Sequence, residues 1–241
     1  MVYGDSEARL GEAGVAGWHV VTKLPAVPGT CPDLDAWVRA AVAASLERLQ
    51  TGRVAGLLLH RPQQLLEPRG AELFAALQSL KADRLVDQIG VSISDPAELD
   101  ELCCRFAFDL VQAPFNVFDR RLATSGWLAR LHRDGVAVHA RSAFLQGLLL
   151  LDAGARPAQF APWQPLFEQW QQWLEAEQVP SVQACLAVGL AEPAIDRVIV
   201  GVDSLRHLEE IVAAANATPV VPPMSLTTND TGLINPARWA Q

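Results

Sequence analysis

The feature that most constrains the fold is a short apolar run at residues 56–59, followed at once by His60, Arg61 and Pro62. An apolar run of this length, bounded by turn residues, is typical of a strand buried on both faces, as in parallel sheets. Pro62 cannot donate to a strand ladder, so the strand must end before it. His60 is therefore expected at the carboxyl end of a buried strand, either as a hydrogen-bonded structural histidine or as a functional group.

The rest of the chain alternates predicted strands with predicted helices. Strands are expected at 18–24, 88–93, 110–114, 136–141 and 197–202, and helices within 3–14 and at 33–50, 70–82, from 95, from 115 to 131, 181–190 and after Ser204. Such alternation implies a parallel sheet with crossover helices. An open doubly wound sheet would call for a Gly-x-Gly-x-x-Gly loop, which the sequence lacks. We therefore expect an α/β fold of the (β/α)8 TIM-barrel type with about six strands visible, as a single domain over residues 1–241. A helix inserted at 159–177, in which Trp163, Trp170 and Trp173 either pack it on the barrel or line a pocket, and a tail at 217–241 complete it.

Composition narrows the partners of this protein. The 241 residues carry a net charge of -8, which argues against binding to nucleic acid or to an anionic membrane surface. No apolar run is long enough to span a membrane, and the histidines and cysteines show no metal-ligand spacing. The four cysteines have apolar neighbours and are expected to be buried, reduced thiols. With no signal peptide after Met1, a cytoplasmic location is expected.

Three residues at or near strand ends suggest carbonyl chemistry: Tyr3, Lys23 and His60. An ammonium group near a tyrosine lowers the tyrosine pKa and makes the hydroxyl a usable proton donor. A neutral histidine can donate a hydrogen bond that orients a substrate carbonyl. Spacing alone leaves structural alternatives open, with Tyr3 as a terminal aromatic and Lys23 as a solvated charge at a strand end.

A series of segments resembles the aldo/keto reductase family, in the order in which that family has them. They are residues 3–11 (YGDSEARLG), 21–23 (VTK), 57–62 (LLLHRP), 89–92 (IGVS), 111–116 (VQAPFN), 140–147 (ARSAFLQG) and 198–201 (VIVG). The resemblance implies reduction of an aldehyde or ketone by hydride transfer from NAD(P)H, with Tyr3 as general acid, Lys23 tuning it and His60 orienting the carbonyl. It also implies a small-molecule carbonyl substrate, whose identity and the oligomeric state stay open.

The same resemblance assigns residues to the cofactor. Ser92 and Gln112 would hold the nicotinamide carboxamide, and Arg141 stands where many members have an aromatic residue that stacks on the nicotinamide. NADPH is the expected cofactor. NADH stays an alternative, because three residues weaken the expected site for a 2′-phosphate: His207 replaces the common basic residue, Ile211 replaces the usual Asn, and Asp203 adds a negative charge. The remaining assignments are Ser142, Phe144 and Leu145 along the pyrophosphate and Gly201, Ser204, His207 and Glu210 at the adenosine end.

The family pattern also implies a strand, a helix and a second strand before Tyr3, the second strand carrying an aspartate that pairs with the lysine. Two explanations follow: a longer natural protein, or a shortened reductase in which turnover is low or absent. Ile93 and Ile211 stand where the family often has Asn. The alternative to an enzyme is therefore a non-catalytic barrel that binds a nucleotide or a protein partner.

Overall fold

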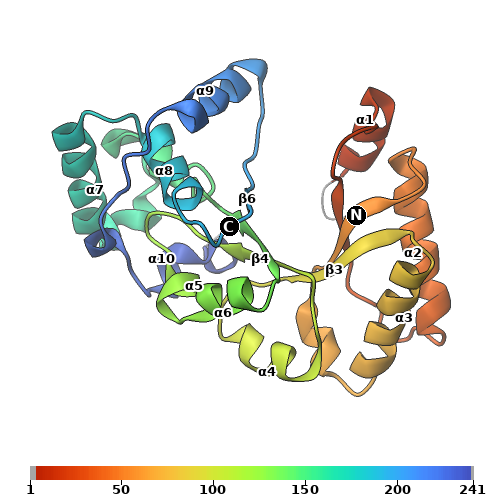
Figure 1. The fold of residues 1–241 in the computed structure, drawn as a ribbon. Coiled ribbons are helices and arrows are strands. Elements are labelled where there is room, and N and C mark those ends of the chain that lie inside the picture. Colours follow the sequence, from red (N-terminus) through yellow and green to blue (C-terminus); the bar gives the residue numbers. More distant parts are fainter. Residues whose placement is uncertain (1–3, 240–241) are drawn as a thin grey trace. The chain divides into compact units, whose positions relative to one another are not determined.

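The computed structural model describes residues 4–239. The chain forms two compact units. The first runs to Gln112 and includes Gly135–Ala137, and the second comprises Ala113–Asp134 and the chain from Val138 onward. Six strands form a parallel sheet in the order β1-β2-β3-β4-β5-β6 (Figure 1). No described helix is long and apolar enough to cross a membrane.

The first unit alternates strands and helices as the sequence predicts. Helices α2 and α3 contact each other and lie along the strands β1 to β3 (Figure 1). The elements are α1 (Ser6–Ala13), β1 (Val21–Leu24), α2 (Leu34–Arg48), β2 (Val54–Leu59), η1 (Pro62–Leu66), α3 (Gly70–Ala82), β3 (Val86–Ser92), α4 (Glu98–Arg105) and β4 (Leu110–Pro114).

The buried faces of these strands explain the apolar runs. Leu57, Leu58 and Leu59 of β2 are at most 2% exposed, as expected for a strand covered on both faces. Gly90 of β3 lies so close to β4 that a Cβ atom there would stand 2.0 Å from the Leu110 carbonyl oxygen. The strand at 18–24 was predicted too long: β1 begins only at Val21, and Trp18 is 78% exposed.

The second unit is mainly helical. Its elements are α5 (Arg121–Thr124), α6 (Trp127–Arg133), β5 (Ala137–Arg141, whose first residue is grouped with the first unit), η2 (Leu148–Leu150), η3 (Ala153–Ala155), η4 (Ala158–Trp163), α7 (Gln164–Glu177), α8 (Ser181–Leu190), β6 (Arg197–Val198), α9 (Leu205–Asn216), η5 (Met224–Leu226), α10 (Thr231–Ile234) and η6 (Pro236–Arg238). The tryptophan of α7 at position 170 is fully buried and donates its Nε1–H to the Leu149 carbonyl at 3.1 Å.

Two expectations for the second unit were wrong. The helix expected from 115 to 131 is two short helices, because Gly126 between them has a left-handed φ of 82°. The strand expected at 197–202 is only two residues long. Beyond β6 the chain is not in a strand, and Ile199 and Val202 are 37% and 43% exposed, since β6 is at the end of the strand order.

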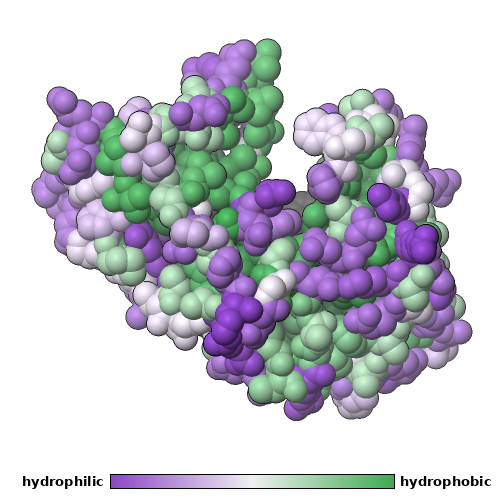
Figure 2. Space-filling view, in the orientation of Figure 1, coloured by the Kyte–Doolittle hydropathy of each residue, from purple (hydrophilic) through white to green (hydrophobic). Residues whose placement is uncertain are grey.

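Apolar side chains stay exposed on α9, where Figure 2 shows hydrophobic surface beside polar surface. Leu205, Leu208 and Val212 are 70%, 43% and 49% exposed, and α9 has no buried residue. The expectation that all four cysteines are buried was also wrong in part, since Cys104 is exposed and Cys103 is half-buried, while Cys31 and Cys185 are buried. Position 104 lies on α4, whose buried residues are Leu99 and Leu102.

Candidate functional site

Strands β1 and β2 bring Lys23 and His60 to one cavity. The parallel register pairs Lys23 with Leu58, and the His60 backbone N–H donates to the Leu24 carbonyl at 3.1 Å just beyond β2. Both side chains line a cavity of about 120 Å³. The prediction that these two residues share a site at the strand ends is therefore supported by geometry. Tyr3, the expected general acid, lies outside the described residues.

The same cavity has a carboxylate in its wall that the sequence reading did not single out. Glu7 of α1 is 8% exposed; its Oε1 accepts from the Thr22 hydroxyl at 2.5 Å, and its Oε2 accepts from Arg48 Nε at 2.9 Å. Helix α1 also lies tightly on the end of α2, since a Cβ at Gly11 would stand 2.1 Å from the Arg48 carbonyl oxygen. These contacts fix α1 to the strand that carries Lys23.

Ser92 and Gln112 form a second feature of the first unit. They are Cα partners in the register of β3 and β4, so their side chains leave the sheet on the same face. Ser92 is 9% exposed and Gln112 is 5% exposed, and neither side chain makes a hydrogen bond to another described residue. Their polar atoms are not among the fully buried unpaired nitrogen and oxygen atoms, so they keep some access to solvent or to a ligand. A carboxamide, which offers both a donor and an acceptor, fits this pair.

The segment from Arg141 to Gly147 in the second unit has an uncommon backbone. Ser142, Leu145 and Gln146 have φ angles of 62°, 46° and 56°, the left-handed region that side chains other than glycine rarely adopt. Such conformations cluster at ligand sites, where the surrounding structure holds them. Arg141 Nη1 donates to Ser142 Oγ at 3.1 Å. Leu145 is fully buried and its backbone N–H donates to the Ser142 carbonyl at 2.9 Å, while Phe144 is half-buried.

The amino-terminal end of α9 carries the residues expected at the adenosine end. Ser204 is the N-cap of this helix, and its Oγ accepts from the His207 backbone N–H at 3.2 Å. Gly201, Ser204 and Glu210 are exposed and His207 is half-buried. The first turn of an α-helix attracts anions through its unpaired N–H groups and its dipole. This end of α9 is thus open to solvent and suited to a phosphate.

One cation at this helix end was missed in the sequence. Arg206 has a 77% exposed side chain, and its Nε lies 3.8 Å from Glu210 Oε1, an exposed pair of small energetic weight. Its position directly after the capped start of α9 was the signal available. A guanidinium is the group that a 2′-phosphate prefers.

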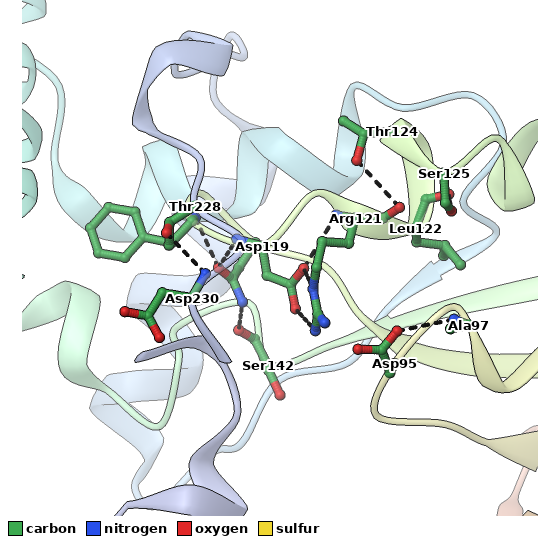
Figure 3. A network of polar contacts seen from close by, with 12 residues as sticks. Asp95, Ala97, Asp119, Arg121, Leu122, Thr124, Ser125, Ser142, Thr228 and Asp230 are labelled. Atoms are coloured by element: carbon green, nitrogen blue, oxygen red, sulfur yellow. Dashed lines mark hydrogen bonds and ion pairs between the residues drawn. The ribbon is translucent and has the colours of Figure 1, made fainter. Parts of the chain in front are cut away.

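A buried polar loop after β4 was also missed. Asn116 is fully buried and Asp119 is 1% exposed, and Asp119 forms an ion pair with Arg121 in which Oδ1 and Nε are 2.9 Å apart (Figure 3). Asn116 Nδ2 donates to the Ser142 carbonyl at 3.1 Å. The loop is thus joined directly to the segment expected along the pyrophosphate. The sequence signal available for this loop was the placement of Asn116 and Asp119 directly after the aromatic residues Phe115 and Phe118.

Comparison with known proteins identifies relatives. The Aldo/keto reductase family model matches residues 1–224. The uncharacterized oxidoreductase YqkF of Bacillus subtilis (strain 168) is 29% identical over 191 residues, which cover 76% of this chain and 61% of YqkF. The chain thus spans about three fifths of the length of that curated relative.

Solved structures agree on the fold. The apo form of aldo-keto reductase AKR11C1 from Bacillus halodurans is similar with a TM-score of 0.71 at 22% identity, over 91% of this chain and 74% of that chain. Its holo form gives a TM-score of 0.70 at 23% identity, over 89% and 73% of the two chains. The six parallel strands are part of a (β/α)8 barrel. With nearly the whole sequence matched by the family model and the barrel strands in family order, the chain belongs to the aldo/keto reductase family.

Proposed function

We propose that this protein is an NAD(P)H-dependent reductase of a small aldehyde or ketone. The observation that carries the proposal is the cavity that Lys23 and His60 line together, each at the end of a neighbouring parallel strand. In barrels of this type the carboxyl ends of the strands form the active site. Family membership supports the reaction class.

The chemistry follows from these side chains. A reduced nicotinamide, when bound, supplies the hydride that the carbonyl carbon accepts. His60 donates a hydrogen bond that orients the carbonyl and stabilises the charge that develops on its oxygen. Tyr3 gives its hydroxyl proton to that oxygen, so the product is an alcohol. Lys23 carries a positive charge that favours the phenolate left on Tyr3, which lowers the tyrosine pKa toward the working pH.

The cofactor residues fall into two groups. In the first unit, Ser92 and Gln112 are buried without partners among the described residues and would hold the carboxamide of the nicotinamide. In the second unit, Arg141 would stand at the nicotinamide, Ser142, Phe144 and Leu145 would lie along the pyrophosphate, and Gly201, Ser204, His207 and Glu210 would hold the adenosine end. Arg206 adds a cation there, which favours NADPH over NADH.

The cofactor preference is tested by titration with NADPH and NADH, followed by tryptophan fluorescence. Saturable quenching by both nucleotides is expected, with tighter binding of NADPH. Arg206→Ala should narrow the difference in affinity between the two, because NADH lacks the 2′-phosphate that the guanidinium would bind. No quenching by either nucleotide would contradict the proposal.

The reaction is tested by following NADPH oxidation with a panel of aldehydes and ketones. His60→Gln should lower carbonyl-dependent oxidation at least about tenfold, because the orienting donor is misplaced. His132→Gln is the matched control, since His132 is exposed on α6, and should leave the rate unchanged. Lys23→Met should also lower the rate.

The second candidate is a non-catalytic barrel that binds nucleotide or a protein partner. Ile93 and Ile211 favour it, because each stands where the family often has a polar residue. Quenching by NADPH without oxidation of any carbonyl compound would select this function, and oxidation that depends on His60 would exclude it.

A further inference from the structure

Asn116 stands at the start of the buried polar loop of residues 116–121. Its side chain is fully buried in the second unit, directly after the last residues of β4. A buried side-chain amide requires hydrogen-bond partners, since leaving it without them is costly. The arrangement of those partners indicates what Asn116 does.

Three hydrogen bonds use both ends of the Asn116 amide. Its Oδ1 accepts from the backbone N–H groups of Phe118 and Asp119, each at 3.0 Å. Its Nδ2 donates to the Ser142 carbonyl oxygen at 3.1 Å. The first two bonds hold Asn116 within its own loop, while the third reaches a segment 26 residues away in the chain.

The loop itself is anchored by other contacts. Asp119 and Arg121 form a two-oxygen ion pair with both distances at 2.9 Å (Figure 3). The Arg120 guanidinium donates to the Pro222 carbonyl at 2.7 Å, and Thr228 donates its backbone N–H to the Phe118 carbonyl at 2.9 Å. The loop is therefore a fixed support, tied to the C-terminal segment.

The Ser142 carbonyl is held on two sides. It accepts from Asn116 Nδ2 and also from the Leu145 backbone N–H at 2.9 Å, which closes a turn over residues 142–145. Ser142 has a φ of 62°, which is unfavourable for a residue with a side chain. The bond from Asn116 stabilises this peptide in a conformation that it would otherwise leave.

We propose that Asn116 is a positioning residue of the cofactor site: by holding the Ser142 carbonyl, it fixes the turn at residues 142–145 that binds the pyrophosphate. The inference rests on the proposed cofactor binding. Asn116 touches no cofactor itself. Loss of the Asn116 side chain lets the Ser142 peptide turn away, which misplaces the Ser142 hydroxyl and the backbone amides of the turn.

The test compares Asn116→Ala with the unmodified protein by tryptophan fluorescence titration. The dissociation constant for NADPH should rise at least about tenfold, since one well-placed hydrogen bond to the turn is lost. The dissociation constant for adenosine 2′,5′-bisphosphate, which has no pyrophosphate, should stay within about twofold. Asn235→Ala, which removes an amide that caps Ala237 at 3.1 Å, is the matched control and should leave both constants unchanged.

A second variant keeps the test decisive if Asn116→Ala does not fold. Asn116→Asp, measured at pH 8, retains an oxygen for Phe118 and Asp119 but has no donor for Ser142, and should weaken NADPH binding to the same extent.

The outcomes separate this inference from the proposed function. If the unmodified protein binds NADPH and the Asn116 variants bind it within about twofold, the inference is overturned and the proposed function stands. Equal losses for NADPH and for adenosine 2′,5′-bisphosphate would also overturn it, because they indicate a general structural role. If the unmodified protein binds neither NADPH nor NADH, both fail together.

Discussion

The hydroxyl of Thr22 donates to the buried carboxylate of Glu7, with Oγ1 and Oε1 2.5 Å apart. The other oxygen of this carboxylate accepts from Arg48, whose Nη2 lies 2.8 Å away. The Glu7 carboxylate thus joins α1 to β1 and to the end of α2. Its contact on β1 is Thr22, the residue directly before Lys23. The side chains of Thr22 and Lys23 leave the strand on opposite faces. The Thr22–Glu7 hydrogen bond on one face therefore fixes the strand that carries the Lys23 ammonium on the other face.

Removing the hydroxyl at position 22 should therefore destabilise the first unit. Thr22→Val keeps the β-branched shape but leaves a buried carboxylate oxygen without its donor, which costs about 1–2 kcal/mol of the free energy of unfolding. Thr22→Ser retains the donor and should cost less. Urea denaturation followed by tryptophan fluorescence measures both. Equal stabilities for the two variants would mean that the hydroxyl contributes nothing.

A second prediction concerns Gly90, at which β3 packs closely on β4. A Cβ at this position would stand 2.0 Å from the Leu110 carbonyl oxygen and 2.8 Å from Leu58 Cδ2, so backbone as well as side chain would have to move. Gly90→Ala should destabilise by about 3 kcal/mol or more, or prevent folding. Gly52→Ala is the control, because a Cβ there meets no atom within 4 Å. Thermal unfolding of the two proteins decides, and a small effect at Gly90 would contradict the strand pairing.

Much of the fold could be predicted because periodicity is a local property. The run that became β2 has no polar side chain from Val54 to Leu59, as is typical of a strand buried on both faces. The errors lie where tertiary contacts decide. The sequence after Val198 is β-branched like a strand, yet Ile199 lies outside β6 because β6 is at the end of the sheet. Gly126 interrupts a helical pattern that its neighbours would otherwise continue.

The candidate site divides in the same way. Lys23 and His60 could be predicted as neighbours because the ends of adjacent parallel strands meet at one edge. Glu7 and Asn116 could not, because their roles depend on partners 15 and 26 residues away that no local pattern reveals. A polar residue beside apolar ones can be a buried hydrogen-bonding group or a surface residue, and only the fold distinguishes the two.

His139 of β5 gives a prediction about pH. Burial lowers the pKa of His139 below its usual 6.5, and the charge of Arg197 lowers it further, while Asp196 opposes this. Below pH 6.5 the unfolded chain therefore binds more protons at this residue than the folded chain does. The folding stability contributed by neutral His139 is present above pH 6.5 and is lost as the pH falls through the lower, folded-state pKa.

The measurement is the free energy of unfolding of the unmodified protein and of His139→Asn between pH 7.5 and 5. The variant should lose less stability over this range, because it has no proton to gain at position 139. His132→Gln is the matched control, since His132 is exposed, and it should follow the unmodified protein. Parallel curves for all three proteins would show that His139 titrates alike in both states.

The cysteines give the last prediction, on thiol reactivity. Burial raises the pKa of the Cys185 thiol far above its usual range, and the thiolate is the form that reacts. Cys104 is exposed, while Cys31 is buried and its Sγ donates to the Asp33 carbonyl at 3.2 Å. With a disulfide reagent at pH 8, the native protein should therefore label rapidly at Cys104 and more slowly at the half-buried Cys103, and Cys31 and Cys185 should label only on unfolding. Cys104→Ser should remove the fast phase, whereas Cys185→Ser should leave it unchanged. Rapid labelling of Cys185 in the native protein would mean that α8 opens readily, because a thiol this deeply buried reacts only when its surroundings expose it.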